Sequence, residues 1–504
     1  MSAQRAIDLI LLNGRIYTLD APGRVAALAI SAGRIVALGA DEQIRALASE
    51  GTETVDLQAK TVLPGFIDAH THLVSTGLVE TVYLDLAEAG SLEKLLELVR
   101  AAVARRAEGE WLIGRGWDES RWPEGRFVTR ADLDRVTPEN PVALFRVDGH
   151  LLCVNSKALE LLQLPGELRG QADLERGLLR EEAAWWFNEQ VQPGPEEIER
   201  ALAAATRLAH SLGITSVHDL VKPSYIRVYQ RLRPKLRVYL NPKVEYADEL
   251  YKAGLATGFG DEWLRLGAMK IFADGSIGAG NAALSKPYRD REGQGQLNYE
   301  PDELFQIVKR AHEHGWQVMA HAIGDRAIEL VLDVYERAGI GPDDRYRIEH
   351  LELADGEQVE KAARLGVIAS MQPNFVKWAG PGGLYETRLG PERARRIGPH
   401  RLVLDSGVHL ACGSDCMPLG PLFGVHQAVN APHPAQRLTV EEALRCYTLG
   451  GAYASFEEEL KGSLTPGKLA DLVVLSADPF EHPEEIEEVQ VKMTLVGGEP
   501  VPAH

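Results

Sequence analysis

The chain has 504 residues, of which 45% are hydrophobic and 25% are charged, a composition typical of globular proteins. Asp and Glu outnumber Lys and Arg by 73 to 54, so the net charge is −19. This acidic balance argues against nucleic acid or an anionic membrane as a partner, because both attract basic surfaces. Four cysteines are too few for a disulfide framework. No apolar stretch reaches the roughly 18–20 residues of a membrane helix, and the first residues resemble a strand and a turn rather than a signal peptide. We therefore expect a cytoplasmic protein.

Short β-rich segments occur at both ends of the chain. Three lie near the N-terminus and two near the C-terminus, at residues 8–19, 26–38, 54–62, 470–475 and 489–496. Asn-Gly, Pro-Gly and Gly-Gly pairs mark the turns beside them. We expect residues 1–60 and 459–504 to combine into one composite β-sandwich domain.

Between the two ends, short apolar strands alternate with amphipathic helices. The strand candidates lie at 61–70, 214–219, 236–244, 266–272, 317–321, 347–351, 367–371 and 409–413. Eight such units predict an α/β fold, a (β/α)8 TIM barrel over residues 61–458, with its active site at the carboxyl ends of the strands. A doubly wound sheet is the alternative, but a Gly-rich phosphate loop after the first strand is missing. The long gap after the first strand predicts an insertion at about 75–195 that recognises substrate or acts as a lid.

His70 and His72 stand at the end of the first strand candidate. Residues two apart on a strand point to the same face, so both imidazoles can reach one metal ion. Imidazole suits zinc, iron, nickel or copper. A pair of histidines in a strand-end loop is the alternative, because the His-x-His pattern alone is weak.

Further polar residues fall where other strand candidates end, namely Lys270, His321, His350 and Asp415. Burial of Lys270 in an apolar strand would lower the pKa of its ammonium group, and a neutral amine can capture carbon dioxide as a carbamate. Each residue has an ordinary alternative: an ion-paired lysine, a hydrogen-bonded histidine, or an aspartate that caps a turn. Barrel closure would bring all of them to one mouth with the His-x-His pair, and this convergence predicts a metal centre.

The inserted region supplies candidates for substrate binding. His150 follows a strand candidate and could hydrogen-bond the substrate carbonyl, and Trp117 could form an aromatic wall beside Asp118. Glu181 stands where a helix is expected to begin. The alternatives are a surface-loop histidine, a packed tryptophan and a solvated glutamate.

Several segments resemble the amidohydrolase superfamily of metal-dependent hydrolases. They are Leu63-Pro-Gly-Phe-Ile-Asp-Ala-His-Thr-His72 and Leu464-Thr-Pro-Gly-Lys-Leu-Ala-Asp471. Others are similar to amidohydrolase family 3, a branch that includes the N-substituted formamide deformylases: Lys270-Ile-Phe-Ala-Asp-Gly-Ser-Ile-Gly278, His321-Ala-Ile-Gly-Asp-Arg326, Gly116-Trp-Asp118, and Gly149-His150 with Val154-Asn-Ser-Lys-Ala-Leu159. The resemblance spans nearly the whole chain.

The resemblance implies a (β/α)8 barrel with a β-sandwich built from both termini. It also implies two metal ions, with His70 and His72 on the more buried ion and His321 and His350 on the more exposed one. Lys270, carboxylated, would bridge the ions, and Asp415 would bind the buried ion and serve as general acid and base. The number of ions stays open at one or two. Zinc is expected first, with manganese, iron or nickel as alternatives.

The predicted function is hydrolysis of a non-peptide, amide-type C–N bond of a small molecule by metal-activated hydroxide, with Asp415, His350 and His150 as catalytic residues. A mononuclear deaminase of a heterocyclic amine is the alternative, although superfamily deaminases commonly lack the lysine ligand. A non-catalytic degenerate barrel is disfavoured because no ligand position is lost. A structural zinc module is disfavoured because such sites are cysteine-rich. A homodimer is expected only from the prevalence of two-fold assemblies.

Overall fold

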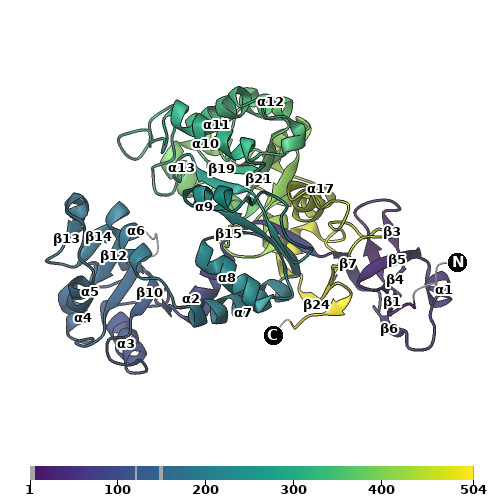
Figure 1. Ribbon diagram of the computed structural model, residues 1–504, viewed down its shortest axis with the longest axis horizontal. Helices are drawn as coiled ribbons and strands as arrows, with labels where there is room; N and C mark the ends of the chain where they lie inside the picture. Colours follow the sequence, from purple (N-terminus) through teal and green to yellow (C-terminus); the bar gives the residue numbers. More distant parts are fainter. Residues whose placement is uncertain (1–5, 120–121, 147–150, 503–504) are drawn as a thin grey trace. The chain divides into compact units, whose positions relative to one another are not determined.

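The structure is a computed structural model that describes residues 6–119, 122–146 and 151–502 (Figure 1). The chain divides into two compact units. One combines Met1–Leu73 with Thr206–His504, and the other is Val74–Ala205. The smaller unit overlaps the predicted insertion, whose role as a lid stays a prediction. Within the described ranges, no helix has the length and apolar character needed to cross a membrane.

Strands from both ends of the chain share one sheet. β7 (Thr61–Pro64) pairs antiparallel with β23 (Leu472–Leu475) and parallel with β2 (Arg15–Tyr17). In Figure 1 this pairing joins purple N-terminal and yellow C-terminal segments. The sheet extends through β24 (Val491–Val496), β25 (Glu499–Pro500) and β3 (Arg24–Val25). A second sheet contains β5 (Arg34–Gly39), β4 (Ala27–Ser31), β1 (Leu9–Leu12) and β6 (Glu53–Asp56). Buried residues of both sheets, such as Leu28 and Val474, form one apolar core.

Two sheets of parallel strands carry the residues of the predicted site. The first contains β8 (Phe66–Thr71), β15 (Ile214–Val221), β16 (Arg237–Pro242) and β17 (Leu264–Leu266). The second contains β18 (Met269–Phe272), β19 (Val318–Ala322), β20 (Arg347–His350), β21 (Ile368–Met371) and β22 (Leu410–Cys412). Almost every residue of these strands is buried, as expected for parallel sheets that are covered on both faces.

Backbone contacts join the two parallel sheets at two places. Lys243 and Lys270 form a parallel bridge between the end of β16 and β18. At the other edge, the backbone N–H of Asp415 donates to the carbonyl of His70, with N and O 2.9 Å apart. The carboxyl ends of β8 and β22 are therefore held together.

Helices separate the strands along the chain. They include α7 (Pro195–Ser211), α8 (Pro223–Leu232), α9 (Ala247–Lys252), α10 (Pro301–Glu313), α11 (Asp325–Arg337), α12 (Gly356–Leu365), α15 (His400–Asp405), α16 (Pro421–Val429) and α17 (Val440–Arg445). Local chemistry sets their ends. For example, the Asp355 carboxylate accepts the Gln358 backbone N–H at 3.0 Å where α12 begins, and Gly366 ends this helix with φ 69°.

Two of the eight strands predicted for the barrel are each divided in two. The candidate at 61–70 is split at Gly65 into β7, in the sheet of the chain ends, and β8, in a parallel sheet. A Cβ at Gly65 would lie 2.3 Å from Thr215 Cγ2, so only glycine fits this close crossing. The candidate at 266–272 is interrupted because the Asn241 side chain, rather than a neighbouring strand, accepts the N–H of Ala268 at 2.8 Å.

The unit of residues 74–205 contains its own six-stranded sheet. Its strands, in order, are β13 (Ala172–Asp173), β14 (Leu178–Arg180), β12 (Leu151–Val154), β11 (Val142–Arg146), β10 (Leu112–Trp117) and β9 (Leu84–Asp85). β10 and β11 run parallel, whereas β11 and β12 run antiparallel. Buried residues of α3 (Leu92–Val103), such as Leu95 and Val99, belong to the core of this unit.

Candidate metal centre

Three side chains of the ligand type meet where β8 and β22 end. The ligand atoms of His70, His72 and Asp415 lie within 4.8 Å of one another. Asp415 Oδ1 is 3.1 Å from His72 Nε2 and 3.7 Å from His70 Nε2. His70 is buried, and the Asp415 side chain is only 14% exposed. Imidazole nitrogens with a carboxylate oxygen form a donor set that suits a divalent transition metal.

Lys270 is fully buried in β18. Its Nζ atom has no hydrogen-bond partner among the residues that the structure describes. Burial lowers the pKa of Lys270 to about 8, although the charges of Glu349 and Asp415 act in the opposite direction. Its Nζ lies 4.7 Å from the ring centroid of Phe272, but a buried amine without a hydrogen bond is costly for the fold. A carbamate on this nitrogen would replace the amine by oxygen ligands.

The rings of His321 and His350 lie close to one another and to His70. The ring centroids of His321 and His350 are 4.4 Å apart, and those of His70 and His350 are 5.0 Å apart. Nδ1 of His350 is buried and forms no hydrogen bond within the described part of the chain. Burial and the charge of Lys270 lower the pKa of His321 to about 3, and burial also holds the pKa of His350 well below its ordinary value. Both rings are therefore neutral, which is the form that binds metal.

The structure thus brings together the residues predicted for a metal centre. His70, His72 and Asp415 form one group, and His350 links His70 to His321. The positive charge of Lys270 lowers the pKa of His70, after the larger effect of burial. Among the described residues, the buried nitrogens Nζ of Lys270 and Nδ1 of His350 have no hydrogen-bond partner and are left for a ligand. These residues fit a divalent metal ion.

Sequence reasoning missed Glu349, a buried residue of β20 whose carboxylate contacts the ring of His70. Its carboxylate is hydrogen-bonded to Nδ1 of His70, accepts Nε of Arg347 at 2.8 Å, and accepts the hydroxyl of Ser370 at 2.8 Å. Burial alone would raise the pKa of Glu349, but the charges of Arg347 and His70 hold it well below its usual range. The alternation of Arg347 and Glu349 on one face of β20 was the only available signal, and local spacing cannot show that this face meets His70.

Two other missed carboxylates hold the loops around the centre. Asp68 accepts the backbone N–H of Ser414 at 2.9 Å and its hydroxyl at 2.5 Å, which anchors the residue before Asp415. Asp274 accepts the backbone N–H groups of Ile323 at 3.0 Å and Gly324 at 2.9 Å, just after His321. Burial raises the pKa of Asp68 and of Asp274 to about 7, against these hydrogen bonds.

The predicted substrate-binding residues belong to the unit of residues 74–205. His150 and the side chain of Glu181 lie outside the described residues. Trp117 is fully buried, its Nε1–H donates to the carbonyl of Leu144 at 3.0 Å, and its ring packs beside Trp122. This burial favours packing over an aromatic wall. Asp118 lies 3.4 Å from a guanidinium nitrogen of Arg146, and its role in binding stays a prediction.

Parallel strands whose carboxyl ends gather histidines, a lysine and an aspartate are typical of metal-dependent hydrolases. The chain belongs to the amidohydrolase family, whose family model matches residues 53–502. N-substituted formamide deformylase of Arthrobacter pascens is 30% identical over 539 residues, which cover 97% of both chains. Protein LONG AFTER FAR-RED 3 of Arabidopsis thaliana is 31% identical over 537 residues, covering 97% of this chain and 91% of the relative.

A solved structure supports the same family. An uncharacterized metal-dependent hydrolase from Pyrococcus furiosus aligns with a TM-score of 0.82 and 32% identity, over 94% of this chain and 99% of that chain. The family resemblance and the prediction of a hydrolase that acts on C–N bonds are confirmed.

Proposed function

We propose that the protein hydrolyses a non-peptide, amide-type C–N bond of a small molecule at a centre of one or two divalent metal ions. One observation carries this proposal: the ligand atoms of His70, His72 and Asp415 lie within 4.8 Å of one another at adjoining strand ends. Nζ of Lys270, which has no hydrogen-bond partner among the described residues, supports it as a further ligand position. A lysine ligand favours amide hydrolysis over deamination of a heterocyclic amine.

The same proposal includes a closed (β/α)8 barrel over residues 61–458, in which β17 and β18 are halves of one strand. The bridge between Lys243 and Lys270 and the hydrogen bond from Asp415 to His70 support closure, because they join the parallel sheets at both edges. The composite domain of residues 1–60 and 459–504 is supported by the apolar core that both chain ends share and by the antiparallel bridge between Arg34 and Leu469. β7, at residues 61–64, extends this domain slightly beyond the predicted boundary. The cytoplasmic location and the homodimer stay predictions of the sequence.

The ligands divide between two positions in this proposal. His70, His72 and Asp415 would hold the more buried ion, and His321 and His350 would hold the second. Lys270, as its carbamate, would contribute an oxygen to each. A divalent ion bound there would polarise a carbonyl and lower the pKa of water from about 16 to about 7.

Asp415 moves the proton. Its carboxylate lies between the two imidazoles, 3.1 Å from Nε2 of His72, and its backbone N–H is fixed to the carbonyl of His70. The backbone bond fixes the position of the residue at the strand end, and Oδ1 beside the imidazoles accepts a proton from the attacking water and returns it to the departing nitrogen. Such a relay is typically worth about 10²–10⁴-fold in rate.

A formamide or another N-acyl amine is the substrate class that we favour. The name of the Arthrobacter pascens relative points to N-substituted formamides. Aromatic residues adjoin the centre on the side of His350: Phe375 stacks on its ring with centroids 5.9 Å apart, and Trp378 lies 5.2 Å from Phe375. An apolar substituent on nitrogen would suit this wall.

Metal content and turnover test the proposal together. Elemental mass spectrometry on protein purified without chelator should find about two ions per chain, and N-formyl and N-acyl amines should be hydrolysed. Removal of metal with a chelator should abolish turnover, and zinc with bicarbonate should restore it. About one ion per chain, with release of ammonia from heterocyclic amines, would favour the deaminase. Absence of metal binding after incubation with zinc, manganese, iron or nickel would overturn the proposal.

A further inference from the structure

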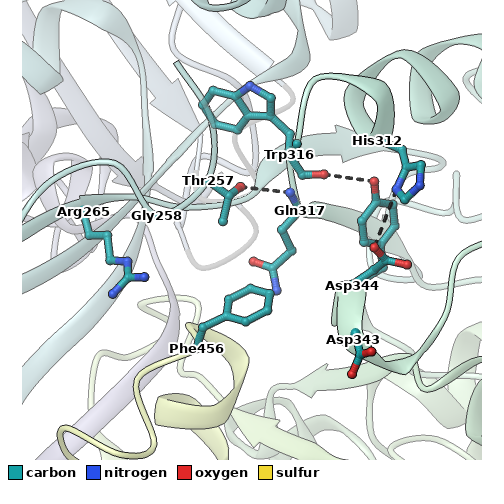
Figure 2. Close-up of a pocket in the computed structure, with 11 residues that line it drawn as sticks. Thr257, Gly258, Arg265, His312, Trp316, Gln317, Asp343, Asp344 and Phe456 are labelled. Atoms are coloured by element: carbon teal, nitrogen blue, oxygen red, sulfur yellow. Dashed lines mark hydrogen bonds and ion pairs between the residues drawn. The ribbon is translucent and has the colours of Figure 1, made fainter. Parts of the chain in front are cut away.

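A cavity lies at the amino ends of β19 and β20, the strands that carry His321 and His350. Its volume is about 350 Å³ (Figure 2). Two of its lining residues, Gln317 and Tyr346, come immediately before β19 and β20. The candidate metal centre lies at the carboxyl ends of these strands, so this cavity at their amino ends is a separate site. Its size falls within the range of small-molecule pockets.

One side of the cavity carries a cation that has no ion-pair partner in the described part of the chain. Arg265, on β17, extends its guanidinium group from the side opposite His312 and the aspartates (Figure 2). Its Nε atom is buried without a hydrogen-bond partner, and among described residues its side chain makes no ion pair. A Cβ at Gly258 would lie 3.3 Å from Arg265 Nη2, so glycine keeps the space beside the guanidinium group open. A partly buried guanidinium group without partners is costly, and a carboxylate can satisfy it with two parallel hydrogen bonds.

The other side of the cavity is acidic. Asp343 and Asp344 line it on the side of His312 (Figure 2). Asp344 accepts the backbone N–H of Gly341 at 2.8 Å and lies 3.7 Å from Nδ1 of His312. Asp343 is exposed, and its carboxylate forms no hydrogen bond or ion pair to any described residue. This side favours a cationic group.

Between the two sides, the polar side chain of Gln317 already has hydrogen-bond partners within the protein. The side chain of Gln317 accepts the hydroxyl of Tyr239 at 3.0 Å and donates to the carbonyls of Arg345 and Ala454. Phe456 adds an apolar surface beside it (Figure 2). The unsatisfied charges therefore lie at the two sides, with neutral and apolar surface between them.

We propose that this cavity binds a small zwitterion, an amino acid whose carboxylate pairs with Arg265 and whose amine faces Asp343 and Asp344. A simple anion would meet the two aspartates, and a simple cation would leave Arg265 unpaired. The carbon chain of the ligand would lie along Phe456.

Calorimetric titration of the full chain tests this proposal. The probes are glycine, 4-aminobutyrate, 6-aminohexanoate and 8-aminooctanoate, with hexanoate and hexylamine as single-charge controls. At least one amino acid should bind saturably, and at least tenfold more tightly than either control. No saturable binding of any amino acid would overturn the proposal. If hexanoate bound as tightly as the amino acids, the proposed role of the aspartates would be wrong.

Two variants test separately the side of the cavity that carries Arg265 and the side that carries the aspartates. Arg265→Met should weaken binding of the amino acid at least tenfold, whereas Arg364→Met, at an exposed arginine of α12, should not change it. Asp343→Asn changes only an exposed side chain, so it stays informative if Arg265→Met fails to fold. It should weaken binding of the amino acid and leave hexanoate unaffected. Unchanged affinity in Asp343→Asn, or in a folded Arg265→Met, would contradict the assignment.

Discussion

Nδ1 of His70 is hydrogen-bonded to the buried carboxylate of Glu349, although the two residues are 279 positions apart in the chain. This bond leaves Nε2 as the nitrogen that faces Asp415, at 3.7 Å from Oδ1. Glu349 is itself held by Arg347 and Ser370. A carboxylate that holds a histidine in this way fixes which nitrogen can bind a metal and makes that nitrogen more basic.

Glu349→Gln should therefore weaken metal binding by about 10–100-fold. It should also lower the free energy of unfolding by up to about 3–5 kcal/mol, because Arg347 loses its buried counter-charge. Metal affinity measured by chelator competition, with urea unfolding of the metal-free protein, checks both effects. Glu357→Gln, at the exposed start of α12, is the matched control. Unchanged metal affinity in Glu349→Gln would show that the contact is only structural.

Asp415→Asn should lower turnover by at least about 10²–10⁴-fold in metal-loaded protein, because the amide cannot accept the proton. The fold should be retained, since the backbone hydrogen bond from Asp415 to His70 does not involve the side chain. Steady-state kinetics measure the turnover, and elemental analysis of each preparation gives the number of metal ions per chain. Asp405→Asn, at an exposed residue of α15, controls for the charge change. Near-native turnover in metal-loaded Asp415→Asn would remove its catalytic role.

Lys270→Met should reduce metal content from about two ions to one or none, because methionine is an unbranched side chain only one atom shorter than lysine but cannot form a carbamate. In the unmodified protein, ¹³C-bicarbonate should give a carbamate signal by NMR that Lys270→Met lacks. Lys252→Met, at the exposed end of α9, should keep both the signal and the metal. Two ions in Lys270→Met, or no carbamate signal in the unmodified protein, would identify Lys270 as an ordinary buried lysine.

Asp132 should make the stability of residues 74–205 depend on pH. Burial acts to raise its pKa, but hydrogen bonds from Arg126 at 2.7 Å and from Thr129 lower it from 3.8 to about 2. Because the pKa of Asp132 is lower in the folded than in the unfolded protein, its ionised carboxylate stabilises the fold above about pH 4. This stabilisation is lost as the pH falls toward 2. The contribution is about 2 kcal/mol.

Urea unfolding of Asp132→Asn between pH 2 and 7 tests this dependence. The variant should be less stable than the unmodified protein at pH 7, and the difference should shrink as the pH approaches 2. Asp302→Asn, at an exposed residue of α10, is the control. A difference that stays constant across this range would contradict the assignment to Asp132.

Local spacing was sufficient to predict most of the strands and the polar side chains that they carry, whereas the roles of these side chains as ligands stay predictions. Lys270 lies within β18, His321 lies near the end of β19, and Asp415 follows β22. The placement of His70 and His72 on one face of a strand likewise follows from their spacing. The family could also be recognised, because its motifs are contiguous stretches of chain. Roles for His150, Asp118 and Glu181 stay predictions.

Tertiary structure alone decided the features that depend on distant contacts. The sequence around Gly65 resembles one continuous strand, and only the close approach of Thr215 shows why it divides between two sheets. Trp117 could have lined a pocket, but packing against Trp122 buries it. Glu349 resembles any strand carboxylate until folding places it against His70. Sequence periodicity reports which face of an element is buried, whereas the partner on that face is chosen by packing between segments far apart in the chain.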